Sequence, residues 1–321
     1  MKKENPRISV IIICYNQEEI ISRAINSVIC QKDYLYELII SDDCSTDGTW
    51  NVIRGYLNKY PDKIKAYRQE HNLGVYENLH STYDKVTGDI VFFLSGDDEF
   101  GCELFKKTCE TVISADVDFS KDKYCVITDF KAIYPDGKEV IRNENNLVEK
   151  HNPFSLKFRG LVYGRGRGES YEIFKERKNV IIKRKKGSII SSSLQEGFTD
   201  NFPFYATDAV YYIPYIGNIY YAGIGISTKF KKNRKEYLEG LIEYCNNIPN
   251  YFHKLNKYDL NWLQFHKIKS QFLLTPNIIN YFKYVWMFIY LCRDPLSKFF
   301  LFREFKSIVK SFLLLFMKNR K

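Results

Sequence analysis

The chain of 321 residues has 48 Lys and Arg against 38 Asp and Glu, a formal net charge of +10, and 45% hydrophobic residues. That apolar share supports a packed core and excludes a disordered chain; the length fits one large α/β domain or two smaller ones. Residues 1–250 hold 35 basic and 35 acidic side chains, whereas residues 251–321 hold 13 basic and 3 acidic. A neutral body with a basic end is not the pattern of a chain that wraps nucleic acid, so no such partner is expected.

The first hundred residues predict strands that alternate with helices. Apolar and β-branched runs predict strands at Ile8–Cys14, Glu37–Ser41, Ile64–Arg68 and Asp89–Leu94. Apolar residues at helical spacing predict helices at Glu18–Gln31, Asp47–Tyr60 and Glu77–Val86. This alternation predicts βαβ units and therefore an α/β fold with a mostly parallel central sheet flanked by helices.

The pattern changes after Asp98. A helix at Glu103–Ala115 and a strand at Tyr124–Tyr134 come first, and residues 142–205 are irregular. A helix at Asp208–Ile216 and a closing strand at Gly217–Ile226 are then predicted. From Lys235 onward the pattern is helical and strongly aromatic. We therefore expect one domain over residues 1–234, divided into 1–100 and 101–234, and a helical, basic and aromatic region over residues 235–321.

The cysteines and the apolar stretches bear on where the protein acts. None of the eight cysteines forms a Cys-x-x-Cys pair or has a histidine at zinc-finger spacing, which favours reduced, structural thiols in the cytoplasm. The segment before the first strand is too short for a signal peptide. The stretches Tyr284–Cys292 and Phe299–Met317 are too short or too interrupted by charge for a spanning helix, which needs roughly 20 apolar residues.

Polar side chains follow three of the predicted strands. The first strand runs into Cys14-Tyr15-Asn16, the second into Asp42–Gly48, and the fourth into Ser95–Asp98. In a parallel α/β sheet, ligands bind beyond the carboxyl ends of the strands, so these clusters mark a candidate site. Paired carboxylates suit Mg²⁺ or Mn²⁺, which leave coordination positions for phosphate oxygens. Neither Gly-x-x-x-x-Gly-Lys-Ser/Thr nor Gly-x-Gly-x-x-Gly is present, which counts against a P-loop and a dinucleotide-binding enzyme.

Four segments, in order, resemble the family 2 glycosyltransferases. They are the opening strand Ile8–Glu18, the D-D-x-S-x-D-x-T turn Ser41–Thr49, the N-x-G element His71–Val75 and the D-x-D region Leu94–Asp98. The resemblance covers about the first 100 residues. It implies a GT-A fold and an inverting transfer from a nucleotide-sugar donor, with a UDP-sugar expected. The acceptor implied is a hydroxyl of a glycan or a polyprenyl-diphosphate-linked molecule in cell-surface polysaccharide biosynthesis.

The resemblance also implies a role for particular residues. Asp43 matches the residue that hydrogen-bonds the nucleotide base. Cys14, Tyr15 and Asn16 match the loop that lines the nucleoside, and Glu18 lies nearby in the sequence. Asp97 matches the carboxylate near the ribose and the metal. Asp98 matches the ligand through which Mn²⁺ or Mg²⁺ bridges to the diphosphate, where the metal would neutralise the leaving group. Many relatives have Asp where this chain has Ser95.

An inverting displacement needs one general base on the acceptor side. Asp208 is the candidate because Tyr205–Tyr212 resembles the family's E-D motif, with Thr207 in place of the Glu. Asp200 is the alternative. The Gly164–Gly168 segment, Gly-Arg-Gly-Arg-Gly, is read as a flexible loop or as one that orders over the diphosphate.

The basic end of the chain has two interpretations. Leu301, Phe305, Ile308, Phe312 and Leu315 share one face of a predicted helix. That face either packs onto the catalytic domain or a second subunit, or lies on an anionic membrane, which would place the enzyme on the inner face of the plasma membrane. A homo-oligomer is left open. Two other functions also stay open: a nucleotide-sugar-binding scaffold without turnover, and a nucleotidyltransferase.

Overall fold

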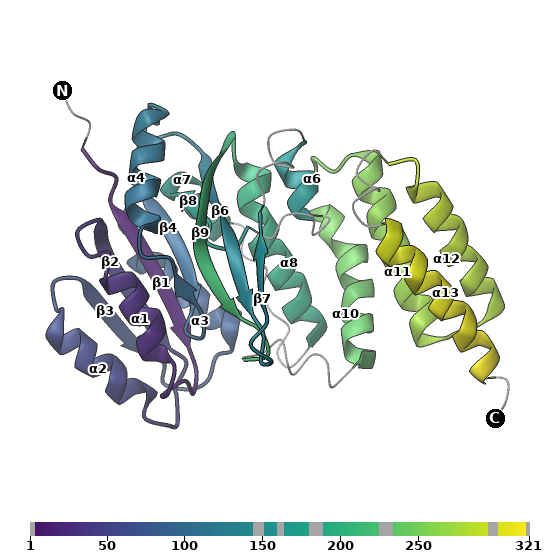
Figure 1. Cartoon of the computed structure of the whole chain (residues 1–321), viewed down its shortest axis with the longest axis horizontal. Coiled ribbons are helices and arrows are strands. Elements are labelled where there is room, and N and C mark those ends of the chain that lie inside the picture. Colours follow the sequence, from purple (N-terminus) through teal and green to yellow (C-terminus); the bar gives the residue numbers. More distant parts are fainter. Residues whose placement is uncertain are drawn as a thin grey trace. The chain divides into compact units, whose positions relative to one another are not determined.

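The computed structural model describes residues 4–143, 151–158, 164–179, 189–224, 234–294 and 301–318. The chain divides into two compact units, whose elements are labelled in Figure 1. Unit 1 comprises Met1–Pro153, Val162–Ile181 and Phe202–Thr228, and unit 2 comprises Phe154–Leu161, Ile182–Asn201 and Lys229–Lys321. The division expected from the sequence, at residue 234, did not group the two short middle segments with the C-terminal region.

Unit 1 is built on a nine-stranded sheet with the order β3-β2-β1-β4-β8-β6-β9-β5, and β7 pairs with β6. The strands are β1 (Ile8–Cys14), β2 (Leu35–Asp42), β3 (Ile64–Arg68), β4 (Ile90–Ser95), β5 (Glu99–Phe100), β6 (Tyr124–Ile133), β7 (Glu139–Arg142), β8 (Gly168–Ser170) and β9 (Ala209–Tyr221). β1 to β4 pair in parallel, as predicted. The short β8 runs antiparallel to both β4 and β6, so β6 and its parallel partner β9 point the same way as β1.

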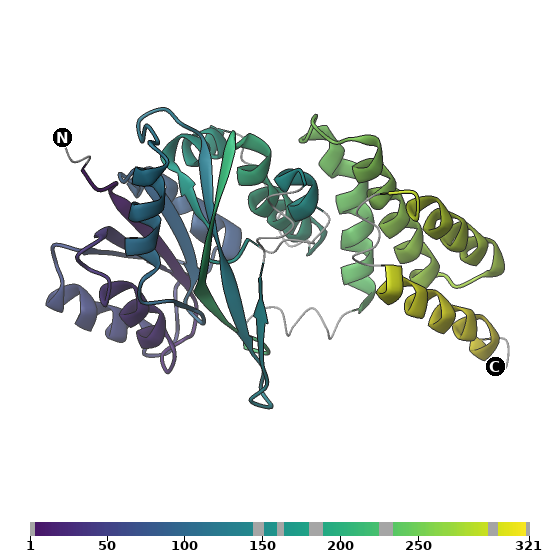
Figure 2. The same ribbon diagram turned by 45° about the horizontal axis from the view of Figure 1, so that its top comes forward.

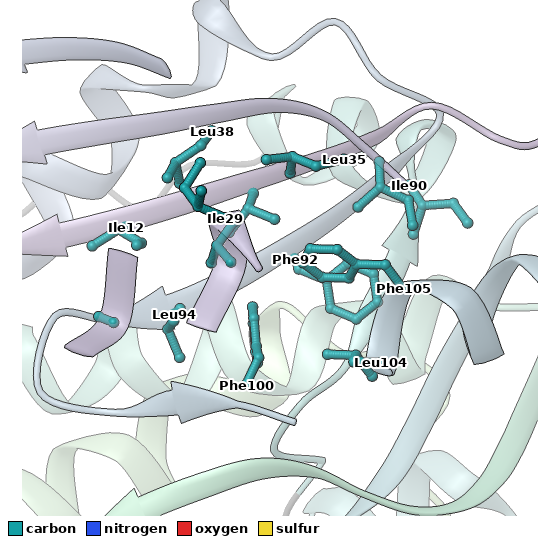
Figure 3. Close-up of a cluster of buried hydrophobic side chains, with 14 of the residues drawn as sticks. Ile12, Ile29, Leu35, Leu38, Ile90, Phe92, Leu94, Phe100, Leu104 and Phe105 are labelled. Carbon is teal, nitrogen blue, oxygen red and sulfur yellow. The ribbon is translucent and has the colours of Figure 1, made fainter. Parts of the chain in front are cut away.

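Helices cover both faces of this sheet. α1 (Ile21–Ile29), α2 (Thr49–Lys59) and α4 (Leu104–Ser114) share one buried cluster with the sheet. In α1, Ile21, Ala24, Ile25 and Val28 recur at helical spacing and are fully buried. Figure 3 shows how Phe92 of β4 and Phe105 of α4 meet in this core. The opposite face is covered by α3 (Val75–Ser81), the 3₁₀ turn η1 (Tyr83–Lys85) and α7 (Tyr171–Asn179).

The segment after Asp208 is a strand where a helix was predicted. β9 runs from Ala209 to Tyr221, so it takes the place of the helix predicted at 208–216 and includes the first part of the closing strand predicted at Gly217–Ile226. Its residues are mostly aromatic or β-branched, which favours a strand, and Pro214 disfavours a helix interior. The β6–β9 register shifts where Ile213 and Ile216 pair with adjacent residues of β6, and Pro214 lies in that irregularity, where no ladder hydrogen bond is needed from it.

Unit 2 is helical in its described part, in agreement with the pattern after Lys235. Its elements are α10 (Arg234–Asn247), the 3₁₀ turn η2 (Ile248–Asn250), α11 (Lys257–Leu274), α12 (Ile278–Leu291) and α13 (Leu301–Lys318), drawn in green to yellow in Figure 2. α6 (Pro153–Phe158) lies almost wholly in unit 2, and α8 (Ile189–Ala206) continues from unit 2 into unit 1. Asn256 and Asp259 cap α11 reciprocally, and Asp259 also accepts a hydrogen bond from Ser155 of α6. No helix in the described ranges is both long and apolar enough to cross a bilayer.

A buried ion pair joins α7 to the sheet of unit 1. Arg177 and Glu169 are both almost inaccessible to solvent, and Arg177 Nη1 donates to Glu169 Oε2 at 3.1 Å. The Arg177 guanidinium also lies 4.9 Å from the ring centroid of Phe93. Because Glu169 belongs to β8, between β4 and β6, this pair stabilises the point where the parallel and antiparallel parts of the sheet join.

Arg177→Met should destabilise unit 1 by about 3–5 kcal/mol, because it leaves the Glu169 carboxylate buried without its partner. Adding Glu169→Gln should recover part of that loss. Urea unfolding in a Trp262→Phe, Trp286→Phe background measures this, since the remaining tryptophan, Trp50, lies in unit 1. If the double variant loses the sum of the two single losses, the two residues are not coupled.

Partly buried His80 should make unit 1 less stable in acid. Burial, and then the Arg177 charge, lower the pKa of His80 to about 4. The unfolded chain binds this proton near pH 6.5 and the folded chain only near pH 4, so stability falls as the pH drops through that window. The loss should be roughly 1–3 kcal/mol, since one pKa unit is worth about 1.4 kcal/mol and solvent screens the exposed part of the ring. His80→Gln should match the wild-type pH dependence of urea unfolding above pH 7 and lose less stability below pH 6; parallel curves would contradict this assignment.

Candidate functional site

The carboxyl ends of β1, β2 and β4 meet at one edge of the sheet, as the sequence predicted. The Asp43 amide donates to the Cys14 carbonyl oxygen at 2.9 Å, and the Gly96 amide donates to the Ile13 carbonyl oxygen at 3.1 Å. A Cβ atom on Gly96 would lie 3.1 Å from Cys14 Cβ and closer still to Gln17, so the loop after β4 needs a glycine there. These contacts hold the loops after three strands against one another.

Asn16 and Glu18 connect the loop after β1 to the loop after β2. Asn16 adopts a left-handed backbone with φ of 51°, and its side-chain oxygen accepts from the Thr46 amide at 2.8 Å. Glu18 Oε2 accepts from the Gly48 amide at 2.8 Å, at the amino end of α2. A carboxylate at this position satisfies an unpaired helix amide and complements the helix dipole. Both residues therefore lie at the predicted edge with a structural role of their own.

Cys14 and Tyr15 face different surroundings. The Cys14 side chain is buried in the core, with its sulfur 3.7 Å from the Ser41 carbonyl oxygen, and burial raises the pKa of its thiol. Tyr15 is exposed at the site edge. Of these two candidate nucleoside-lining residues, only Tyr15 presents its side chain to solvent.

Asp43 holds the loop that precedes α3. Its two carboxylate oxygens accept the amides of Leu73 and Gly74 at 2.7 and 2.8 Å, and Gly74 has φ of 81°. The Asn72 side chain donates to the Asp43 carbonyl oxygen at 3.3 Å, which explains why the 71–75 motif accompanies the Asp43 motif. Burial raises the pKa of Asp43 despite these two amides. Each carboxylate oxygen keeps a second lone pair that a ligand can use.

Asp97 and Asp98 are the buried acidic pair after β4. Burial raises the pKa of Asp97, and the nearby Ser95 side chain opposes part of this rise. Burial, and then the charge of Asp97, raise the pKa of Asp98 to about 7. Asp98 Oδ1 accepts the amide of Tyr221, at the end of β9, at 3.1 Å. The site thus favours a compensating positive charge.

Two arginines that the sequence did not identify as site residues lie beside this pair. Arg23 of α1 donates to the Asp97 carbonyl oxygen at 2.6 Å, and its Nε lies 3.1 Å from Glu99 Oε1. Arg165 Nη1 lies 3.6 Å from Asp98 Oδ2. Neither is near the acidic pair in sequence. In the sequence, only the Gly-Arg-Gly-Arg-Gly segment pointed to Arg165 as a possible site residue. Arg23 has the pattern of an ordinary polar position on an amphipathic helix, so nothing in the sequence pointed to it.

The acidic pair fits part of a metal site. Among the described residues, no group of three or more His, Cys, Asp or Glu side chains is arranged to hold a metal ion. Two carboxylates are nevertheless what Mg²⁺ uses when substrate phosphates and water complete its coordination. Asp97 and Asp98 would hold such an ion together with the substrate.

Asp208 lies at the opposite edge of the sheet, which contradicts its prediction as catalytic base. Its amide donates to the carbonyl oxygen of Lys123, just before β6, and its side chain is exposed. Tyr221, which bonds Asp98, pairs with Ile133, ten residues further along β6. At about 3.3 Å per residue, Asp208 is roughly 30 Å from the acidic pair. The expected helix would have returned the chain toward the site, and the strand does not.

Asp200, the alternative base, belongs to unit 2. It lies on α8, is exposed, and its Oδ2 lies 3.2 Å from Lys157 Nζ on α6. This ion pair joins two helices whose residues Lys157 and Asp200 both belong to unit 2.

Part of the chain is similar in sequence to known glycosyltransferases. Residues 9–160 match the family described as Glycosyl transferase family 2. The chain is 31% identical over 127 residues to the putative teichuronic acid biosynthesis glycosyltransferase TuaG of Bacillus subtilis, over 40% of this chain and 50% of that protein. It is 27% identical over 212 residues to the GalNAc(5)-diNAcBac-PP-undecaprenol beta-1,3-glucosyltransferase of Campylobacter jejuni, over 65% of this chain and 59% of that protein.

Solved structures show the same fold. S. aureus TarS 1-349 in complex with UDP-GlcNAc superimposes with a TM-score of 0.60 at 15% identity, over 91% of this chain and 82% of that one. The chain spans between a third and a half of the length of the first curated relatives that it matches. The match over residues 9–160 makes this part of the chain, just under half of its length, similar to glycosyltransferase family 2, and the likeness to TarS shows that the chain shares its fold.

Proposed function

We propose that this protein transfers a sugar from a UDP-sugar to a hydroxyl of a glycan or polyprenyl-diphosphate-linked acceptor in cell-surface polysaccharide biosynthesis. The observation that carries this proposal is the buried Asp97–Asp98 pair at the edge where β1, β2 and β4 end. The UDP-GlcNAc complex of TarS supports the donor class, and the undecaprenol-linked substrate of the Campylobacter relative supports the acceptor class.

The reaction breaks the bond between the anomeric carbon and the diphosphate oxygen, which keeps the electron pair. The acceptor hydroxyl oxygen forms the new bond to that carbon and gives its proton to a base, with inversion of configuration. Mn²⁺ or Mg²⁺ held by Asp98 and Asp97 would stabilise the charge on the departing diphosphate. Asp43 and the Cys14–Asn16 loop, with Glu18 bracing it, would receive the nucleoside at the same edge. Asp208 has no part in this step.

Two substitutions of equal size separate the acidic pair from Asp208. Asp98→Asn should lower the release of UDP from the cognate UDP-sugar, in the presence of Mn²⁺ and acceptor, by about a hundredfold or more, because charge stabilisation of the leaving group is lost. Asp208→Asn should stay within about twofold of wild type, since it lies at the far edge of the sheet.

The assay uses a panel of UDP-sugars with lipid-linked acceptors and measures UDP and pyrophosphate separately. Pyrophosphate release would instead identify a nucleotidyltransferase. Binding of UDP-sugars without any release would identify a scaffold. A large loss in Asp208→Asn with full activity in Asp98→Asn would refute the assignment of the site.

We also propose that α12 and α13 bind an anionic membrane surface. Phe282, Trp286 and Ile289 of α12 are 65%, 69% and 54% exposed, and Phe305 and Val309 of α13 are 57% and 50% exposed. Ile308 of the same helix is buried against α11 and α12, so the single apolar face predicted for α13 divides into a packed part and an exposed part.

Charge supports an anionic lipid surface as the occupant of these faces. Lys283, Lys306 and Lys310 are exposed between the apolar residues, and residues 251–321 contain 13 basic against 3 acidic side chains. Two contributions stabilise a helix on a membrane surface: aromatic side chains insert at the headgroup level, and lysines attract anionic headgroups. Such binding would place the enzyme beside a lipid-linked acceptor.

Phe282→Ser with Trp286→Ser should reduce co-sedimentation with phosphatidylglycerol vesicles by at least about tenfold, because each buried aromatic contributes about 1.5–3 kcal/mol. Tyr134→Ser, which alters an exposed aromatic of unit 1, should bind as wild type does. Equal sedimentation of the double variant would refute the membrane assignment. A dimer of the wild type that dissociates on the same substitutions would assign these faces to a second copy of the chain.

A further inference from the structure

Of the two arginines beside the acidic pair, Arg165 has the weaker polar contacts with the protein. Its Nη1 lies 3.6 Å from Asp98 Oδ2, which is an ion pair but longer than the 2.7–2.9 Å of a charge-assisted hydrogen bond. Within the described part of the chain, it donates no hydrogen bond to a protein atom. Its side chain is 36% exposed, so an incoming ligand can reach it.

The backbone around Arg165 is fixed while its side chain is accessible. Gly164 and Gly166 have φ of 62° and 64°, a conformation that favours glycine. A Cβ atom on Gly166 would lie 2.6 Å from Thr128 Oγ1 and 3.2 Å from the Gly217 carbonyl carbon. The guanidinium itself lies 3.8 Å from the ring centroid of Tyr220. The glycines therefore let the segment press against β6 and β9, and Tyr220 orients the arginine toward Asp98.

Arg23, the other arginine of the site, is already committed to protein groups. It donates a hydrogen bond to the Asp97 carbonyl oxygen and forms an ion pair with Glu99, and its guanidinium lies 3.5 Å from the ring centroid of Tyr221. Tyr221 in turn donates from its hydroxyl to Glu99 at 2.5 Å. Arg23 thus balances the negative charge of the protein, whereas Arg165 can exchange one anionic partner for another.

We propose that Arg165 binds the diphosphate of the nucleotide donor, and that it moves from Asp98 to the phosphate oxygens when the donor enters. The inference rests on the proposed function, since it requires a nucleoside diphosphate group at the acidic pair. A planar guanidinium can give two parallel N–H bonds to a phosphate, which the 3.6 Å contact with Asp98 does not provide. Asp98 is thereby released from its partner at the moment when the donor arrives.

The test measures binding of UDP and UMP by calorimetry in metal-free buffer with EDTA, so that no metal contributes. Arg165→Gln should weaken UDP binding by about tenfold or more, the usual effect of losing a charge-assisted hydrogen bond, and change UMP binding by no more than about twofold. Arg165→Lys, which keeps the charge without the planar fork, should fall between the two. Arg54→Gln, which removes an exposed arginine of α2, controls for net charge and should leave both affinities unchanged.

Whether Asp98→Asn strengthens or weakens UDP binding distinguishes a phosphate-binding role of Arg165 from a purely structural one. In metal-free buffer, Asp98→Asn should bind UDP about three- to tenfold more tightly than wild type, because it frees Arg165 and removes a repelling charge. The gain should shrink in Asp98→Asn with Arg165→Gln, since no arginine is left to free. An undiminished gain, or an unchanged preference for UDP over UMP in Arg165→Gln, would overturn the proposal while leaving the glycosyltransferase function intact. Failure of the wild type to bind UDP with or without Mn²⁺ would overturn the proposed function itself.

Discussion

The burial of two successive carboxylates after β4, next to the partly buried Glu99, is the constraint on which the site depends. Asp97 and Asp98 are almost fully buried and Glu99 follows directly, so their mutual repulsion has to be offset by nearby positive charge. Arg23 comes from α1, Arg165 from the segment before β8, and the Tyr221 amide from the end of β9. Elements far apart in the sequence therefore converge on one strand end, because each supplies a partner for the same group of charges.

The residues of the family motifs also hold the loops of the site in place. Asp43 accepts two amides of the loop before α3, Asn16 accepts an amide of the loop after β2, and Glu18 accepts the amide of Gly48. These side chains make the edge rigid before any ligand arrives, which lowers the entropy cost of binding. A single carboxylate can serve both purposes, since its two oxygens offer about four acceptor positions. The motif residues thus stabilise the fold and shape the ligand surface at once.

The distribution of charge separates two kinds of contact with anions. Unit 1 has 24 basic and 30 acidic side chains and contains the buried acidic pair, which suits a cation and a diphosphate. Unit 2 carries the excess of basic residues together with exposed aromatic residues such as Phe282 and Trp286, which suits an extended anionic surface. The net charge of the whole chain describes neither surface well, because electrostatic attraction depends on where the charges lie within about a Debye length.

The sequence by itself determined the parallel β1–β4 core, its flanking helices and the three strand ends that form the site. Those features follow from local periodicity and from the rule that parallel strands end at one edge, as the buried run at Ile8–Cys14 illustrates. Only the tertiary structure decided that residues 209–221 form a strand that carries Asp208 away from the site, and that Arg23 and Arg165 lie beside the acidic pair. The reason is that strand pairing and charge compensation join residues more than 60 positions apart, which no local pattern records.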